Sequence, residues 1–283
     1  MFLLYPFAFS LQPFKVAVLT VYMSTKEKLS EEIASFEGLW EGGYYEGDPL
    51  NPLAKSTYGN YGYISVLHAT YLRCIKPYIK PAETIALEIG PGRGAWTKTM
   101  LDAKEVWALD ALSAEYNRFF EYLNHPKNVK YFQVQDFECR MLPENYFTYM
   151  FSFGCLCHVS FEGIGEYAKN IFPKLKAGSN CFWLVADKKK YNEFVETEEK
   201  FDIWQGLAPK RKKLAPVRIV FETVSKVTKP TFRKVDDFAD GKGHWYDAGT
   251  ERTCEMLEKI GYKIVDSDVG TSPRDPIIHF VKP

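Results

Sequence analysis

The chain has no surplus of charge of either sign, because 36 Lys and Arg side chains balance 36 Asp and Glu side chains. A nucleic-acid-binding domain usually carries a basic stripe or patch. The one basic cluster here, Lys210–Lys213, is typical of a solvated loop. We therefore expect no nucleic acid among the partners of this protein.

The sequence also lacks a long uninterrupted apolar run. Residues 1–14 carry no charged side chain, but Pro6, Pro13 and Lys15 interrupt them well before the roughly 18 apolar residues of a membrane span. A secretory signal would need a basic start and a small-residue cleavage site, and neither is present. We expect no stable membrane insertion, with a peripheral anchor as the alternative. The polar stretch after Met23 indicates a native start there, which makes residues 1–22 an extraneous or poorly ordered tail.

Cysteine is scarce and shows no repeated spacing: six residues, without a disulfide framework. This usage favours buried free thiols in a reducing compartment, and hence a cytoplasmic protein. The triplet Cys155-Leu156-Cys157, followed by His158, has no second Cys/His pair at ligand spacing. We therefore predict no metal site.

Ordered secondary structure is abundant, as expected for 283 residues of which 46% are hydrophobic and 25% charged. Strand-like and helix-like patterns alternate along the chain. Gly178 and Gly261 stand where helices would end, and Thr250 where a helix would begin. The expected strands are 84–89, 106–110, 129–134, 148–153, 180–186, 262–267 and 276–281, and the expected helices include 113–124, 164–175, 191–205 and 250–260.

This alternation predicts an α/β fold with a Rossmann-like doubly wound sheet, mostly parallel, because each βα unit returns the next strand in the same direction. The last two strands have no helix between them, so they should form an antiparallel C-terminal β-hairpin. We expect a helical and aromatic N-terminal lid at 23–80, a core at 81–190 and 249–283, and an insertion after strand five at 191–248 that contributes to an acceptor pocket.

The most informative segment is the turn at the end of the first core strand. Glu88 ends an apolar run, and Gly90, Gly92 and Gly94 come next at alternate positions, before a helix-like start at Ala95. A strand, a glycine turn and a helix let a nucleotide-like ligand approach the backbone closely.

Over residues 80–190 and 249–283 the chain resembles the class I S-adenosylmethionine-dependent methyltransferases. The resemblance lies in the Glu-x-Gly-x-Gly-x-Gly turn of Glu88–Gly94, in Asp110 at the end of strand two, in Gln135-Asp136-Phe137 after strand three, and in the Leu-Lys-Ala-Gly segment 175–178. It implies S-adenosylmethionine as the cofactor.

The same resemblance implies a role for each matching residue. Glu88, Gly90 and Gly92 would lie at the methionine end of the cofactor, with Arg93 as a candidate partner of the methionine carboxylate. Asp110 would accept hydrogen bonds from both ribose hydroxyls. Asp136 would accept one from the adenine amino group. The full set of candidate cofactor-binding residues is Glu88, Gly90, Pro91, Gly92, Arg93, Asp110, Ala111, Asp136, Phe137, Phe153, Tyr58 and Tyr61.

A nicotinamide-dependent oxidoreductase is the strongest alternative, because Gly90-x-Gly92-x-x-Ala95 also fits the dinucleotide fingerprint. A pyrophosphate rests on backbone N–H groups, however, and Glu88 two residues before the turn brings it no benefit. Glu88, Asp136 and the terminal hairpin favour methyl transfer. A core that binds cofactor but is catalytically inactive, acting as a partner subunit, is a third interpretation.

Methyl transfer to a hydroxyl is helped by a base. His158 comes after strand four, which in this family ends beside the transferable methyl, and it is the candidate general base. A purely structural histidine is the alternative. His244, within the insertion, is a second candidate for the acceptor pocket. The resemblance favours O-methylation of a small molecule or a sugar or glycan hydroxyl; the oligomeric state stays open.

Overall fold

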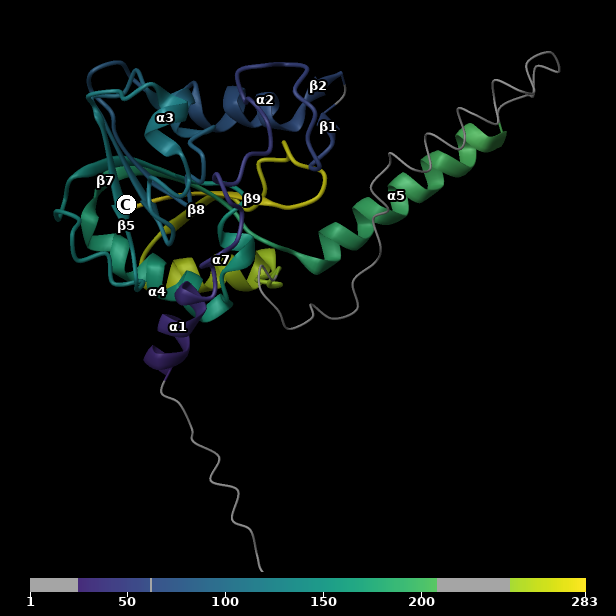
Figure 1. The fold of residues 1–283 in the computed structure, drawn as a ribbon. Coiled ribbons are helices and arrows are strands. Elements are labelled where there is room, and N and C mark those ends of the chain that lie inside the picture. Colours follow the sequence, from purple (N-terminus) through teal and green to yellow (C-terminus); the bar gives the residue numbers. More distant parts are fainter. Residues whose placement is uncertain (1–24, 62, 208–244) are drawn as a thin grey trace, which may run out of the picture.

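A seven-stranded sheet forms the centre of the molecule (Figure 1). The computed structural model describes residues 25–61, 63–207 and 245–283. The strand order across the sheet is β5-β4-β3-β6-β7-β9-β8. The strands are β3 (Ile85–Ile89), β4 (Glu105–Asp110), β5 (Val129–Gln133), β6 (Phe147–Ser152), β7 (Leu175–Leu184), β8 (Lys263–Asp266) and β9 (Ile277–Val281).

The strand directions confirm the predicted fold class. Strands β3 to β7 pair in parallel, whereas β9 runs antiparallel to both of its neighbours, β7 and β8. The order changes direction at β3, whose carboxyl end lies between those of β4 and β6. In open α/β sheets, ligands bind at such a switch point, next to the carboxyl ends of the strands.

Helices cover both faces of the sheet, as the doubly wound prediction requires (Figure 1). Ile85, Leu87 and Ile89 of β3 point to the face that packs against α1 (Thr25–Ala34), α4 (Phe161–Ile171) and α7 (Thr250–Ile260). Alternate residues such as Ala86 point to the other face. That face packs against α2 (Val66–Thr70) and α3 (Phe119–Leu123). The alternation results from the two-residue period of a strand.

Short elements complete the described chain. The N-terminal region contributes a two-stranded antiparallel sheet, and single helical turns come after several core strands. The remaining elements are β1 (Asn60–Tyr61), β2 (Ile64–Ser65), the π-helical η1 (Tyr71–Ile75), the 3-10 helices η2 (Thr97–Met100), η3 (Leu156–His158) and η4 (Phe172–Lys174), and the helix α5 (Lys188–Leu207).

Two predicted helices are shorter than expected. The expected helix at 113–124 is reduced to α3, because Arg118 takes a left-handed conformation with φ of 51° and interrupts it. The helix expected after the glycine turn, from Ala95, is only the single 3-10 turn η2. The glycine turn therefore leads into no regular α-helix.

Of three predicted helix ends, two were wrong and one was right. Gly178 lies within β7 at φ of 79°, where its N–H donates to the Lys282 carbonyl, so it ends no helix. Gly249, not Thr250, is the N-cap residue of α7. Gly261 does end α7 in the left-handed conformation, as predicted.

The two ends of the predicted insertion meet beside the carboxyl end of β7. The N–H groups of Ala248 and Gly249 both donate to the Ala186 carbonyl at 3.0 Å. The Asp187 carboxylate accepts from the Thr250 N–H at 2.8 Å and from its hydroxyl at 2.5 Å. Between these ends, α5 projects away from the sheet (Figure 1). The basic cluster 210–213, His244 and the tail 1–22 lie outside the described residues.

All six cysteines are free thiols, four of them buried, as predicted. Within the described residues no group of His, Cys, Asp and Glu is arranged to hold a metal ion. None of the helices in the described ranges combines the length and the apolar character needed to cross a membrane.

Two glycines in α4 provide a test of the core packing. A Cβ at Gly163 would lie 2.7 Å from Val159 Cγ1 and 2.9 Å from Phe137 Cζ, whereas a Cβ at Gly165 would meet only Met256 Sδ at 4.0 Å. We expect Gly163→Ala to lower the free energy of unfolding by about 1–3 kcal/mol through overpacking. The matched control Gly165→Ala should raise it by about 0.5–1 kcal/mol through helix propensity. Urea denaturation of both variants would contradict this packing if both were stabilised.

Candidate cofactor site

A small cavity of about 70 Å³ opens at the carboxyl ends of β3 and β4, above the glycine turn. Six of the predicted site residues line it, although they come from four separate parts of the sequence. They are Gly90, Gly92, Asp110, Ala111, Phe137 and His158. The topology therefore brings the turn, the end of strand two, the segment after strand three and the end of strand four to one place.

The glycine turn permits a close approach of backbone to neighbouring groups. Gly90 has φ of 69°, and a Cβ there would lie 2.3 Å from Cys155 Sγ. Gly92 has φ of 52°, and a Cβ there would lie 2.8 Å from the Tyr44 carbonyl oxygen. Both positions need glycine for conformation and for space. At Gly94 the neighbours are Phe119 and Leu123, so this glycine serves packing between the turn and α3.

Asp110 connects strand two to the turn. Its Oδ2 accepts a hydrogen bond from the Gly92 N–H at 3.1 Å, and its Oδ1 accepts from the Leu112 N–H at 2.9 Å. Burial raises the pKa of Asp110 to about 6, against the lowering effect of these hydrogen bonds. Hydrogen bonds from the Asn117 side chain and the Ala111 N–H lower the pKa in the same direction.

Glu88 is deeper in the protein than Asp110. It is 2% exposed, and its Oε2 accepts a hydrogen bond from the Thr97 hydroxyl at 2.5 Å. Burial raises its pKa to about 8, and the negative charge of Asp110 adds to the shift. Glu88 does not line the cavity but lies behind its floor, on the strand that carries the turn.

Asn117 is a cavity residue that the sequence patterns missed. Its Nδ2 donates to the Tyr131 hydroxyl at 2.8 Å, and its buried Oδ1 has no hydrogen-bond partner in the described chain. The sequence placed Asn117 inside a continuous helix at 113–124. Only the break at Arg118 turns this segment so that Asn117 faces the cavity.

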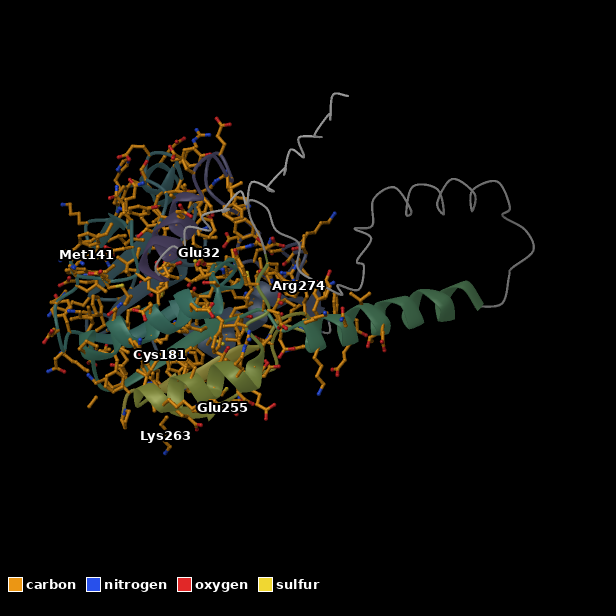
Figure 2. The ribbon with its side chains drawn as sticks, turned by 90° about the horizontal axis from the view of Figure 1, so that it is seen from below. Glu32, Met141, Cys181, Glu255, Lys263 and Arg274 are labelled. Atoms are coloured by element: carbon orange, nitrogen blue, oxygen red, sulfur yellow. The ribbon has the colours of Figure 1, made fainter. Side chains whose placement is uncertain are left out.

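The segment before the sheet covers the cavity. Ile33 and Phe36 at the end of α1, together with Trp40 and Tyr44, form one of its walls. Glu32 holds α1 in place, because its carboxylate accepts from both the N–H and the hydroxyl of Ser160 at 2.6 Å (Figure 2 labels Glu32). A cavity of 70 Å³ is smaller than a typical small-molecule site of about 300–1,000 Å³. A larger cavity of about 620 Å³ shares Ile33, Ala111 and Leu112 with it.

His158 ends the 3-10 turn after β6 and lines the cavity. Its ring lies 5.2 Å from the Trp40 ring, centroid to centroid. His158 therefore faces the same space as the glycine turn, from the segment that comes after the neighbouring strand β6. This position is where the sequence predicted a base.

The other predicted residues lie around the cavity rather than on its wall. Arg93 donates from Nε to the Gly42 carbonyl at 2.6 Å, and Pro91 is buried in the turn. Asp136 accepts from the Glu138 N–H at 2.8 Å and pairs with Arg140.

Phe153 and Tyr58 pack against each other, with ring centroids 4.8 Å apart, on the other side of Gly154. The side chain of Tyr61 lies outside the described part of the structure.

No protein-family model and no curated protein sequence matches the chain. Among solved structures, it is similar to the N-methyltransferase NodS from Bradyrhizobium japonicum in complex with S-adenosyl-L-homocysteine. The identity is 13%, the coverage is 91% of this chain and 98% of that one, and the TM-score is 0.49. It is also similar to the 1,6-didemethyltoxoflavin N1-methyltransferase of Burkholderia thailandensis, at 14% identity, 77% coverage of each chain and a TM-score of 0.46.

A third similar structure is the fibrillarin of Aeropyrum pernix with natively bound S-adenosyl-L-methionine. The identity is 13%, the coverage is 76% of this chain and 74% of that one, and the TM-score is 0.44.

The buried Glu88 carboxyl predicts a pH dependence of stability. Its pKa rises from an ordinary 4.5 to about 8 on folding, so folding favours the protonated form. The corresponding stabilisation is complete below pH 4.5 and is lost as the pH rises through about 8. Glu88→Gln keeps an acceptor for Thr97 without the charge. We expect this variant to be more stable than the parent at pH 9 by several kcal/mol, at about 1.4 kcal/mol per pKa unit.

Guanidinium denaturation at pH 5, 7 and 9 measures this difference. The exposed Glu83→Gln is the matched control and should behave as the parent does at every pH. Parallel stability curves for the parent and Glu88→Gln would show that Glu88 is not buried as the structure has it.

Proposed function

We propose that this protein is an S-adenosylmethionine-dependent methyltransferase that acts on an oxygen of a small molecule. The observation that carries the proposal is a pair of carboxyl groups, the buried Glu88 and the half-buried Asp110, placed around a glycine turn that leads into no α-helix. The resemblance of the Glu88–Gly94 turn and of the later motifs to those of class I S-adenosylmethionine-dependent methyltransferases supports the same interpretation. The described residues offer this cofactor specific partners.

Asp110 suits a ribose. Its carboxylate lines the cavity and is held by the Gly92 and Leu112 N–H groups, so it presents acceptor oxygens to the hydroxyl donors of a ligand. The unpartnered Asn117 Oδ1 on the cavity wall is a further acceptor for a hydroxyl or an ammonium group. Phe137, 3% exposed and on the wall, offers an aromatic edge to an adenine. Every one of these groups accepts a donor or packs against a ring.

A nicotinamide dinucleotide fits the same residues poorly. Its pyrophosphate needs free backbone N–H groups and the positive end of a helix dipole. Here the Gly92 N–H already donates to Asp110, and the segment after the turn is only the 3-10 turn η2. The Asp110 carboxylate, which is ionised at neutral pH, would repel a phosphate at the turn. These features favour a cationic ligand over an anionic one.

Bound S-adenosylmethionine supplies a methyl group activated by an adjacent sulfonium. The protein then has to exclude water and to orient the acceptor, which Phe36, Trp40 and Tyr44 do by closing the cavity. His158 faces the cavity across from Gly90 and Gly92, and a neutral imidazole nitrogen there accepts the proton of an attacking hydroxyl. An inactive cofactor-binding subunit would bind the cofactor without turning over any acceptor.

Asp110→Ala tests the cofactor. Loss of two charge-assisted hydrogen bonds, each contributing about 1.5–3 kcal/mol, should weaken S-adenosylmethionine binding by about 100-fold or more. Isothermal titration with S-adenosylmethionine, S-adenosylhomocysteine and NAD measures the effect, and the exposed Asp102→Ala serves as control. Binding of NAD alone to the parent protein would overturn the proposed function.

His158→Gln tests the base. It should leave S-adenosylhomocysteine binding unchanged and reduce transfer to a hydroxyl acceptor by about 10²–10⁴-fold. The measurement is methyl transfer from labelled S-adenosylmethionine once an acceptor is found by screening. Unchanged turnover would remove His158 from the mechanism while leaving the cofactor assignment intact.

A further inference from the structure

The side-chain amide of Asn117 is buried beside the cavity with one polar atom unused. Asn117 is 0% exposed, and it lines the cavity. Its Oδ1 accepts no hydrogen bond from any of the described residues. Burying a polar atom without a partner costs free energy, so folded proteins keep few such atoms. A ligand that donates a hydrogen bond to Oδ1 would remove that cost.

Hydrogen bonds to its neighbours fix the orientation of the Asn117 amide. The Tyr131 hydroxyl donates to the Leu112 carbonyl oxygen at 2.7 Å, so it has to accept from the Asn117 side chain, 2.8 Å away. The Asn117 side chain also donates to the Asp110 carboxylate. The amide nitrogen donates and a carboxylate accepts, so both bonds require the same orientation. Oδ1 is therefore the amide atom that remains for a ligand, and the ligand has to be a donor.

The surroundings of Asn117 favour a donor that carries a positive charge. The neighbouring Asp110 carboxylate is ionised at neutral pH. Among the described residues that line the cavity there is no Lys or Arg, so no fixed cation balances that charge on the wall. An ammonium group donates hydrogen bonds and brings the missing charge. A cationic donor therefore suits this part of the cavity better than a neutral one.

Asn117 lies beside the second half of the glycine turn. A Cβ at Gly43 would lie 2.5 Å from the Asn117 carbonyl oxygen and 2.8 Å from the Arg93 backbone nitrogen. The backbones of Asn117 and Arg93 therefore both contact Gly43. The resemblance to the methyltransferases implies that the methionine end of the cofactor lies at this turn. Asn117 is thus close to the place where the cofactor would carry its ammonium group.

Glu88, which the resemblance places at the methionine end, does not reach the ligand space. It does not line the cavity, and its Oε2 accepts from the Thr97 hydroxyl at 2.5 Å. Burial raises its pKa to about 8, so Glu88 is largely uncharged at neutral pH. The ammonium group of the cofactor therefore needs an acceptor other than Glu88, and Asn117 offers one.

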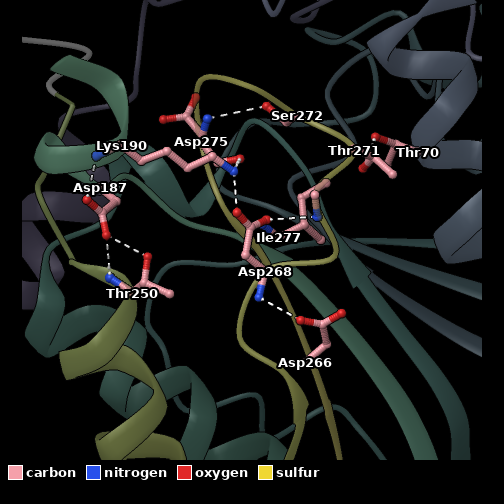
Figure 3. A network of polar contacts seen from close by, with 11 residues as sticks. Thr70, Asp187, Lys190, Thr250, Asp266, Asp268, Thr271, Ser272, Asp275 and Ile277 are labelled. Carbon is pink, nitrogen blue, oxygen red and sulfur yellow. Dashed lines mark hydrogen bonds and ion pairs between the residues drawn. The ribbon is translucent and has the colours of Figure 1, made fainter. Parts of the chain in front are cut away.

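Asp275 Oδ1 is another buried acceptor without a hydrogen-bond partner among the described residues, but its setting differs. The other oxygen of its carboxylate pairs with Arg274 at 2.7 Å. Lys190 lies 3.5 Å from the Asp275 carbonyl oxygen and pairs with Asp268 (Figure 3). Asp275 lines neither the cavity at the glycine turn nor the larger one beside it. Its unused oxygen belongs to a network of ion pairs, whereas Asn117 borders a space that a ligand can fill.

We propose that Asn117 binds the ammonium group of the cofactor's methionine part through Oδ1, next to the negative charge of Asp110. Asp110 then keeps its oxygens for the ribose hydroxyls. An ammonium group has three hydrogen atoms to donate, so one bond to Oδ1 leaves two for other acceptors. This inference rests on the proposed function and adds the residue that recognises the amino-acid end of the cofactor.

The test compares three ligands that share the adenosine part and differ at the amino-acid end. S-Adenosylhomocysteine carries the ammonium and the carboxylate, its decarboxylated analogue carries the ammonium alone, and methylthioadenosine carries neither. Asn117→Ala should weaken the binding of the first two by about tenfold or more, because each loses a charge-assisted hydrogen bond. Methylthioadenosine should bind as it does to the parent, since three backbone N–H groups still hold Asp110 in the variant. Isothermal titration at neutral pH measures all three affinities.

Asn128→Ala is the matched control. The Asn128 amide donates to the carbonyl oxygens of Leu101 and Ala103, outside the cavity wall. Its loss should leave all three affinities unchanged. Asn117→Leu is the second variant if Asn117→Ala does not fold, because leucine fills the volume of the amide, and it should give the same pattern as Asn117→Ala.

The parent protein provides a measurement that needs no variant. It should bind the decarboxylated analogue about tenfold or more tightly than methylthioadenosine, and equal affinities would overturn the ammonium site. An equal loss for all three ligands in the Asn117 variants, or unchanged binding of S-adenosylhomocysteine, would overturn it as well. Failure of the parent to bind S-adenosylhomocysteine would instead count against the proposed function, and it is measured first.

Discussion

The Asp110 carboxylate ties the end of β4 to the glycine turn after β3, and the candidate site depends on that bond. It accepts from the Gly92 N–H on one oxygen and from the Leu112 N–H on the other. Gly92 is thereby held in the left-handed conformation that lets the Tyr44 backbone lie against it. The carboxylate, the turn and the N-terminal wall form one connected arrangement.

The charge of the site depends on the same arrangement of Asp110 and the glycine turn. A buried and a half-buried carboxyl group lie close enough to interact, and the pKa of each is raised, that of Glu88 to about 8 and that of Asp110 to about 6. Removing two acids from water without a fixed cation nearby costs free energy. Acids with raised pKa values of this kind cluster at binding sites. A ligand that brings hydroxyl donors and a positive charge would offset both.

The cover of the site is built from residues far from the turn in sequence. The Glu32 carboxylate accepts hydrogen bonds from the N–H and the hydroxyl of Ser160, the N-cap residue of α4. These bonds fix α1 above the cavity. Burial raises the pKa of Glu32, so this attachment includes a partly desolvated acid. Trp40 and Tyr44, beyond the end of α1, line the same cavity as the glycine turn.

The sequence by itself determined the sheet, its hairpin and the residues of the turn, because apolar period and glycine spacing are local properties. Asp110, Phe137 and His158 could be predicted as neighbours of the turn, since each comes after its own parallel strand and such ends meet at one edge. Only the tertiary structure decided that Asn117 faces the cavity. Arg118 takes the left-handed conformation and α3 is short, while the adjacent Phe119 packs against Tyr131 of β5, an arrangement that no local pattern encodes. The stacking of Arg274 on Tyr58 joins two residues far apart in the sequence, a contact that depends on the placement of β9 beside β7.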